Sequence, residues 1–209
     1  MNYTDSQKTI QYIVLSSVLA AFIAVGAWLR IELPFSPVPI TLQTLFVLLA
    51  GILLPPAWAS ASLALYLFAG IIGLPVFAGG TGGFAVIMGP SGGFLIGFFF
   101  AALVVSLLSG YGRKQIHRQK DKQKDQQADQ QTTRTVRLPA LFFIDIGALI
   151  VGTLIIYAWG YPWIINVLEW DWRLGLARAV VPYLPGDILK IIAAALLTVP
   201  ARRIILRNV

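Results

Sequence analysis

The chain has 209 residues, of which 57% are hydrophobic and 12% charged, and its mean hydropathy is +0.77. A soluble domain carries about 25% charged residues, so this composition excludes an ordinary soluble domain and indicates an integral membrane protein. The net charge of +7 does not indicate nucleic-acid binding, because eight of the sixteen basic residues lie in one segment, between Arg113 and Arg137.

Apolar runs predict an all-α polytopic protein with a single membrane domain over residues 1–209. The first run has no small-residue cleavage site behind it, so we expect a retained helix rather than a signal peptide. The second run is short for a hydrocarbon layer of about 30 Å, and must begin in the preceding turn or be sheltered by its neighbours. Six spans are expected, at about residues 10–30, 39–54, 57–74, 91–109, 139–158 and 187–205.

Small residues recur at helical spacing in two of these spans. Ala20, Ala24 and Ala27 form one such stripe in the first span, and Gly89, Gly93 and Gly97 form another near the fourth. Small side chains permit close approach of helices in a membrane. We expect the glycine set to pack within the bundle and the alanine set to dock a partner, with internal packing as the alternative for the alanines.

Residues 112–138 separate the fourth and fifth spans and are rich in Gln, Lys and Arg. They are too polar to bury a core, which predicts a solvated, disordered loop, and the positive-inside rule places this loop in the cytoplasm. An even number of spans then puts both termini inside. The single histidine, His117, lies in this loop and the chain has no cysteine, so neither a metal site nor a disulfide is expected.

Three connections must then face outward, at about 31–38, 73–90 and 159–186. Irregular backbone at membrane depth is tolerated where it lines a cavity or is buried in protein, so we expect a ligand pocket at the outer mouth. The aromatic residues of the third connection also fit an interfacial belt. The glycines at 79, 80, 82 and 83 fit either a flexible turn or close backbone approach to a ligand or a helix.

Asp187 and Lys190 stand three residues apart at the start of the last span. A charge at the centre of a spanning helix costs about 3 kcal/mol on insertion scales, so an intramembrane charge is a candidate site. The two residues share a helix face, where they bind a polar ligand or form a structural ion pair. Asp145 is a second intramembrane carboxylate, but its expected depth near the inner end argues against an aspartyl enzyme, whose two carboxylates must share a proton.

Four sequence motifs together resemble the BioY family of biotin-binding substrate subunits of prokaryotic energy-coupling-factor (ECF) transporters. The motifs are PVPITLQTL at 37–45, GLPVFAGG at 73–80, GPSGGFLIG at 89–97, and LPGD at 184–187 with Lys190. The resemblance implies a six-helix bundle in the plasma membrane that captures biotin from outside, with Asp187 and Lys190 at positions that contact the vitamin. It also implies partners, namely a transmembrane coupling protein that meets the first helix and a pair of cytoplasmic ATPases, and no cofactor or enzymatic activity.

Biotin offers two ureido N–H donors, a carbonyl acceptor, a carboxylate and a largely apolar body. Asp187 can accept from an N–H, and Lys190 can donate to the carbonyl or neutralise the carboxylate. A substrate subunit for another small vitamin and an intramembrane aspartyl enzyme remain as alternatives. The further residues expected to contact the ligand are Gln43, Phe77, Gly79, Gly80, Thr81, Gly82, Gly83, Phe84 and Tyr183.

Overall fold

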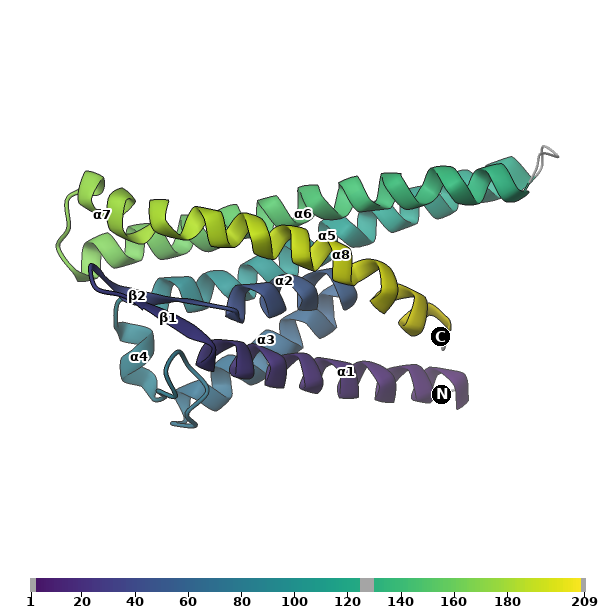
Figure 1. The fold of residues 1–209 in the computed structure, drawn as a ribbon. Coiled ribbons are helices and arrows are strands. Elements are labelled where there is room, and N and C mark those ends of the chain that lie inside the picture. Colours follow the sequence, from purple (N-terminus) through teal and green to yellow (C-terminus); the bar gives the residue numbers. More distant parts are fainter. Residues whose placement is uncertain (1–2, 125–129, 208–209) are drawn as a thin grey trace.

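The computed structural model describes the backbone of residues 3–124 and 130–207, and within these ranges the side chains other than those of residues 3–5, 111–141, 199 and 201–207. Long helices lie side by side in a bundle, and both ends of the chain lie at the same end of it (Figure 1). That arrangement agrees with an even number of crossings. The long helices are α1 (Tyr3–Trp28), α2 (Gln43–Leu53), α3 (Pro56–Ile71), α5 (Gly92–Lys124), α6 (Gln130–Val167) and α8 (Leu184–Arg207).

These helices match the six predicted spans. Among the described residues, four helical stretches are long and apolar enough to cross a membrane, namely Ser6–Trp28, Gly92–Gly110, Phe142–Val167 and Trp172–Thr198. The short second span is confirmed, since α2 has only 11 residues, about 16 Å at the helical rise. Shelter by neighbours explains how so short a helix is accommodated. Val47, Ala50 and Ile52 are fully buried, and α2 packs against α1, α3, α5 and α8.

The segment 112–138, which was predicted to be a loop, has a largely helical backbone in the structure. α5 continues to Lys124 and α6 begins at Gln130, because Gln, Lys and Arg are good helix formers. The cytoplasmic side and the disorder expected for this segment stay predictions, and its side chains lie outside those described.

The first of the three connections that are expected to face outward is a β-hairpin, which the sequence analysis did not predict. Strand β1 (Arg30–Leu33) pairs antiparallel with β2 (Ser36–Thr41), with Ile31 opposite Ile40. Prolines at 37 and 39 argued against a strand, but proline is tolerated on a sheet edge, and this sheet has only two strands. The hairpin extends the chain to the end of the bundle opposite the termini (Figure 1).

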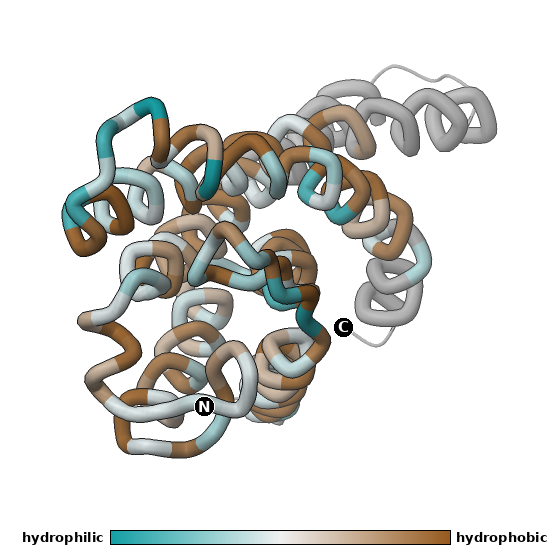
Figure 2. Tube along the Cα trace, turned by 60° about the vertical axis from the view of Figure 1, so that its left-hand side comes forward, coloured by the Kyte–Doolittle hydropathy of each residue, from teal (hydrophilic) through white to brown (hydrophobic). Residues whose placement is uncertain are grey.

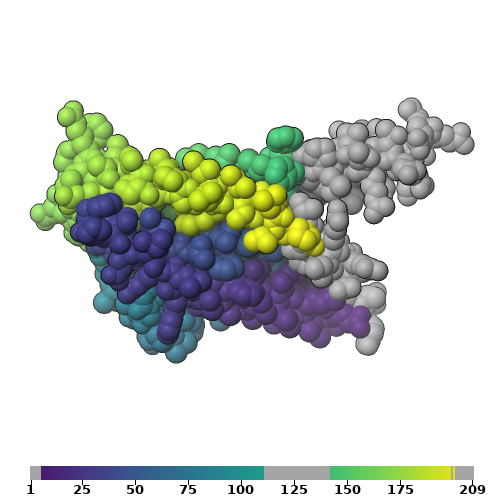
Figure 3. Space-filling view, in the orientation of Figure 1, coloured from purple at the N-terminus to yellow at the C-terminus, as the bar shows by residue number. Residues whose placement is uncertain are grey.

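Two short helices complete the connections at this end. α4 (Phe84–Met88) precedes α5, and α7 (Trp172–Ala179) precedes the 3-10 turn η1 (Val181–Tyr183) and α8. Asp171 caps α7, because its side chain accepts a hydrogen bond of 3.1 Å from the Arg173 backbone N–H. Figure 3 shows the hairpin lying beside the segment that leads into α8.

The core consists of two clusters of buried apolar residues. One lies among α1, α2, α3 and α5 and includes Ile23, Val47 and Leu63, and the other lies among α2, α5, α6 and α8 and includes Leu48 and Leu149. Many large apolar side chains remain exposed on the outside of the bundle, as a lipid-facing surface requires. Figure 2 shows apolar residues along the helices and hydrophilic ones gathered mainly in the connections.

The alanine stripe and two of the three glycines, Gly93 and Gly97, pack within the bundle. Gly89 does not, because it ends α4, and an added Cβ there would meet only carbonyls of its own turn. An added Cβ at Gly93 would lie 2.3 Å from Trp163 Cβ, and one at Gly97 would lie 3.1 Å from Ile156 Cα, so α5 packs closely on α6 as predicted. The partner-facing role expected for the alanine stripe is corrected. Ala20 and Ala27 are buried in the chain's own interior and Ala24 packs against the core, because α1 turns its small face towards α2 and α3.

Candidate functional site

A cavity lies at the hairpin end of the bundle, between β2, α2, α5, α6 and α8. Its apolar lining includes Phe94, Phe98 and Ile156, and its polar lining includes Asp187 and Lys190. A mainly apolar wall with a few convergent polar groups is typical of small-molecule sites. The full lining is Val38, Pro39, Thr41, Thr44, Phe94, Phe98, Ile156, Tyr157, Tyr183, Asp187 and Lys190.

A much smaller cavity adjoins the first one. It is lined by Leu48 and Thr153, together with four residues that also line the larger cavity, Thr44, Ile156, Asp187 and Lys190. The shared residues therefore form a boundary between the two spaces. A ligand in the larger cavity would have its inner end beside these four side chains.

Asp187 and Lys190 form the ion pair that their spacing predicts. Lys190 Nζ lies 3.1 Å from Asp187 Oδ1, and the two side chains are only 9% and 13% exposed, in the order Lys190 and Asp187. Pro185 lies in the first turn of α8, a position where its missing N–H leaves no intrahelical bond unmade. The helix therefore starts just before the pair and places both residues on one face.

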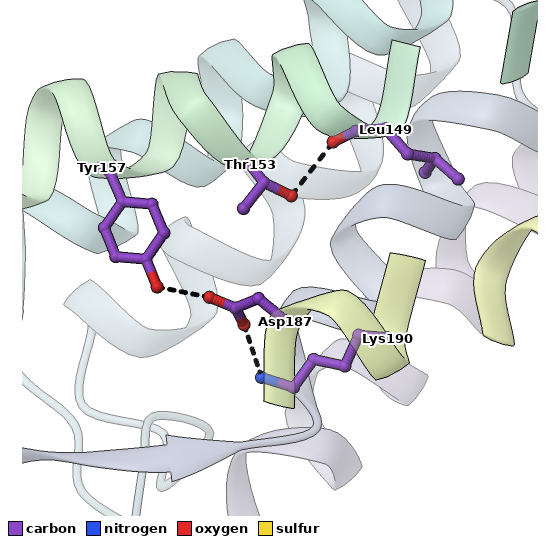
Figure 4. A network of polar contacts seen from close by, with 5 residues as sticks. All are labelled: Leu149, Thr153, Tyr157, Asp187 and Lys190. Carbon is purple, nitrogen blue, oxygen red and sulfur yellow. Dashed lines mark hydrogen bonds and ion pairs between the residues drawn. The ribbon is translucent and has the colours of Figure 1, made fainter. Parts of the chain in front are cut away.

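Tyr157 completes the pair from the facing helix. Its hydroxyl, on α6, donates a hydrogen bond to Asp187 Oδ2, so both carboxylate oxygens have a partner (Figure 4). The three side chains together carry one negative and one positive charge. The site is thus a buried, net-neutral polar cluster with donors and an acceptor directed at each other.

Tyr183 connects this region to the hairpin. Its hydroxyl donates to the backbone carbonyl of Val38, and because a phenol has a single proton, the Ser36 hydroxyl donates to the Tyr183 oxygen at 2.8 Å. These bonds hold β2 against the start of α8, and the hairpin thereby forms part of the cavity wall.

Two residues expected in the pocket belong to the core instead. Gln43 is 3% exposed and donates through Nε2 to the Tyr66 hydroxyl, between α2 and α3. Phe77 is fully buried, and its ring occupies the space where Gly70 lacks a side chain. Both side chains point towards α3, where Gln43 finds its hydrogen-bond partner and Phe77 packs on Gly70. Neither residue lines a described cavity.

The glycine cluster lies in a turn between α3 and α4. Gly79, Gly80 and Gly83 have positive φ angles, which glycine adopts at little cost, and Phe77 N–H donates to Thr81 C=O across the turn at 2.9 Å. The Arg30 guanidinium fills the space that a side chain at Gly79 would occupy. Turn geometry and this close approach account for the cluster.

The structure does not bring this turn together with the ion pair. None of Gly79, Gly80, Thr81, Gly82, Gly83 and Phe84 is among the residues that line the described cavities. Phe84 is 58% exposed, and the Thr81 hydroxyl donates to Ala78 C=O. A contact between these residues and a ligand stays a prediction.

Sequence reasoning missed Thr44, Thr153 and Tyr157. Thr153 and Tyr157 are four residues apart in an otherwise apolar helix, so they share a face, and this polar pair was the available signal. Thr44 offered no signal, because a threonine in the first turn of a helix is common in cores and caps alike.

Asp145 lies far from the cluster. It precedes Tyr157, the partner of Asp187, by about 18 Å along α6, and Ser109 Oγ donates to its Oδ1 at 3.0 Å. Two carboxylates at such different depths cannot share a proton, which argues against an aspartyl enzyme. In the described part of the chain, no group of three or more His, Cys, Asp or Glu residues is placed to hold a metal.

Comparisons with known proteins agree over nearly the whole chain. The model of the BioY family matches residues 2–207. The biotin transporter BioY of Thermotoga maritima is 31% identical over 195 residues, covering 93% of this chain and 98% of that protein. The biotin transporter BioY of Rhizobium etli is 36% identical over 189 residues, covering 88% and 89% respectively.

A solved structure has the same fold. The crystal structure of the S-component for biotin from an ECF-type ABC transporter matches with a TM-score of 0.76 and 26% identity, covering 97% of this chain and 95% of that one. The agreement extends across all six long helices, because so little of either chain is left unmatched.

Proposed function

This chain belongs to the BioY family, and we infer that it takes up biotin as the substrate-binding subunit of an ECF-type transporter. The observation that carries this inference is the buried Asp187–Lys190 pair in the wall of the larger cavity. A purely structural pair needs no adjoining cavity, whereas a binding site does. The function is transport, and no enzymatic step is assigned to the chain.

The cavity has both the apolar and the polar groups that biotin requires. Phe94, Phe98 and Ile156 provide an apolar wall for the sulfur ring and the valerate chain, while Asp187 and Lys190 offer an acceptor and a donor for the polar groups. Hydrogen bonds between these groups and the ligand would discriminate against molecules that cannot form them.

Membership of an ECF-type assembly implies partner components. We propose a transmembrane coupling protein and a pair of cytoplasmic ATPase subunits as those partners. Support comes from the sequence, which contains no Gly-x-x-x-x-Gly-Lys-Ser/Thr motif for binding nucleotide phosphates. Energy for uptake would then come from the partners, and this chain would supply ligand recognition.

The chain is a multi-pass membrane protein, with its spanning helices exposing apolar side chains along the bundle. We propose that it lies in a prokaryotic plasma membrane with both termini in the cytoplasm. The basic segment between Arg113 and Arg137 supports this orientation. With that segment inside, the hairpin and the cavity face outward, as capture of an external vitamin requires.

Direct binding tests the proposed function. The full chain, purified in detergent or nanodiscs, is titrated with biotin by calorimetry, and saturable binding of one biotin per chain is expected. Other small vitamins, such as thiamine, riboflavin and lipoate, serve as competitors and should not displace biotin. Absence of biotin binding, or preferential binding of another vitamin, would contradict the proposal, and chemical conversion of biotin would favour an enzyme.

A further inference from the structure

Thr44 carries a buried hydroxyl that has no hydrogen-bond partner. Among the described side chains, its Oγ1 is the one buried polar atom left without a partner. Buried polar side-chain atoms are normally paired with protein or ordered water. The Thr44 hydroxyl has no partner among the groups of the protein, so it is open to a hydrogen bond from a molecule in the adjoining cavity.

The position of Thr44 indicates what that partner is. Thr44 lies in the first turn of α2 and lines both the larger and the smaller cavity, as Asp187 and Lys190 also do. Thr153 lines the smaller cavity too, but its hydroxyl donates to the Leu149 carbonyl at 3.0 Å within α6 (Figure 4). Of these two threonines at the inner end of the site, Thr44 has the hydroxyl free to serve a ligand.

The charges around Thr44 favour a neutral polar group. Asp187 and Lys190 already compensate each other, and Tyr157 donates to the carboxylate without adding charge. A ligand carboxylate placed here would leave one uncompensated negative charge in a buried site, which is strongly unfavourable. A cyclic urea is neutral and offers two N–H donors and one carbonyl, all of which a hydroxyl, a carboxylate and an ammonium can bind.

We propose that the Thr44 hydroxyl is a specificity-determining hydrogen-bond partner of the ureido group of biotin, an inference that rests on the proposed function. The hydroxyl lacks a protein partner in the empty cavity and gains one on binding. Ligands that lack the urea leave it unpaired, so Thr44 adds to selectivity.

The test is the near-isosteric variant Thr44→Val in the full-length chain, measured by calorimetry with biotin. The variant should bind biotin about five- to tenfold more weakly, the loss expected for one neutral hydrogen bond. Its unfolding temperature without biotin should be equal to or higher than that of the wild type, because the substitution removes an unpaired buried hydroxyl. The matched control is Thr198→Val, because Thr198 is buried, lines neither cavity and donates its hydroxyl to the Ala194 carbonyl within α8 at 2.7 Å. It should change the biotin Kd by less than about twofold.

Two analogues identify the end of biotin that Thr44 meets. Biotinamide, which lacks the carboxylate charge, should show the same loss on Thr44→Val, whereas an analogue that keeps the sulfur ring and valerate but lacks the urea should compete equally well for both proteins. A biotin Kd unchanged within about twofold, a lowered unfolding temperature without ligand, or a loss that disappears with biotinamide would each overturn the proposal. Failure of the wild type to bind biotin would instead overturn the proposed function.

Discussion

Tyr157 on α6 donates its hydroxyl proton to the carboxylate of Asp187 on α8, and this bond links the two helices that form one side of the cavity. Lys190 holds the other carboxylate oxygen at 3.1 Å. The carboxylate orientation is therefore fixed from two sides before any ligand enters. A preorganised acceptor lowers the entropy that binding must lose.

Removing the Tyr157 hydroxyl should weaken binding without disturbing the fold. We expect Tyr157→Phe to raise the biotin Kd about tenfold or more, because hydrogen bonds to charged groups contribute about 1.5–3 kcal/mol. Calorimetry on the purified chain measures this effect. The matched control is Tyr161→Phe, whose hydroxyl donates to Trp172 C=O outside the cavity. Equal affinities for the wild type and Tyr157→Phe would show that the bond has no role in binding.

Asp187→Ala and Lys190→Ala should each remove most biotin binding. Taking one partner from a desolvated ion pair commonly costs about 3–5 kcal/mol, or two to four decades in affinity where the cost falls on the bound state. Calorimetry and thermal unfolding are measured on both single variants and on the double variant. A structural ion pair would give a different pattern, with lower unfolding temperatures but normal biotin binding by the folded protein.

Tyr183 should govern how fast biotin leaves the cavity. Its hydroxyl joins Val38 and Ser36 of the hairpin to the start of α8, so Tyr183→Phe should loosen the hairpin and raise the biotin dissociation rate about five- to tenfold, the effect of losing about one hydrogen bond. Ser36→Ala should have a smaller effect, because Val38 still accepts from Tyr183. Stopped-flow displacement of a fluorescent biotin measures both rates. A rate unchanged by Tyr183→Phe would mean that the hairpin does not retain the ligand.

Local sequence patterns predicted the contacts between residues that are close together in the sequence. The Asp187–Lys190 pair followed from a spacing of three residues on one helix face, and the structure confirms it. The bond from Tyr157 joins residues 30 positions apart, and no local pattern reveals such a partner. The hairpin was not predicted because β2 contains prolines, which are unfavourable inside most strands.

Periodicity also identified helix faces without identifying what each face meets. Ala20, Ala24 and Ala27 do form one small face, but it packs on the chain's own helices. The glycines at 79, 80, 82 and 83 were interpreted as a turn or as a close backbone approach, and the positive φ angles of Gly79, Gly80 and Gly83 agree with a turn. Whether a backbone turn also meets a ligand depends on tertiary placement, which spacing does not encode.

The orientation in the membrane can be tested by cysteine labelling, because the chain has no cysteine of its own. In intact cells, Thr81→Cys should react with a membrane-impermeant thiol reagent, since Thr81 is exposed at the hairpin side of the bundle. Gln123→Cys, in the basic segment, should react only after permeabilisation. Labelling of position 123 in intact cells would reverse the proposed topology.

Bulk on the alanine face of α1 should now destabilise the protein rather than block a partner selectively. Ala20 is 6% exposed and packs in the core between α1, α2 and α3, so Ala20→Trp inserts a large ring into a filled space, at a cost of about 1–3 kcal/mol or more.

Ala21 is the matched control, because the neighbouring position is exposed and Ala21→Trp should be tolerated there. We expect a lower unfolding temperature and a smaller folded, biotin-binding fraction for Ala20→Trp, and neither change for Ala21→Trp. Thermal unfolding and the number of biotin sites per chain are measured on both purified variants. A different result would favour the partner-docking interpretation of the alanine stripe. In that case Ala20→Trp would be as stable as the wild type and would bind biotin fully, yet would fail to support uptake in cells.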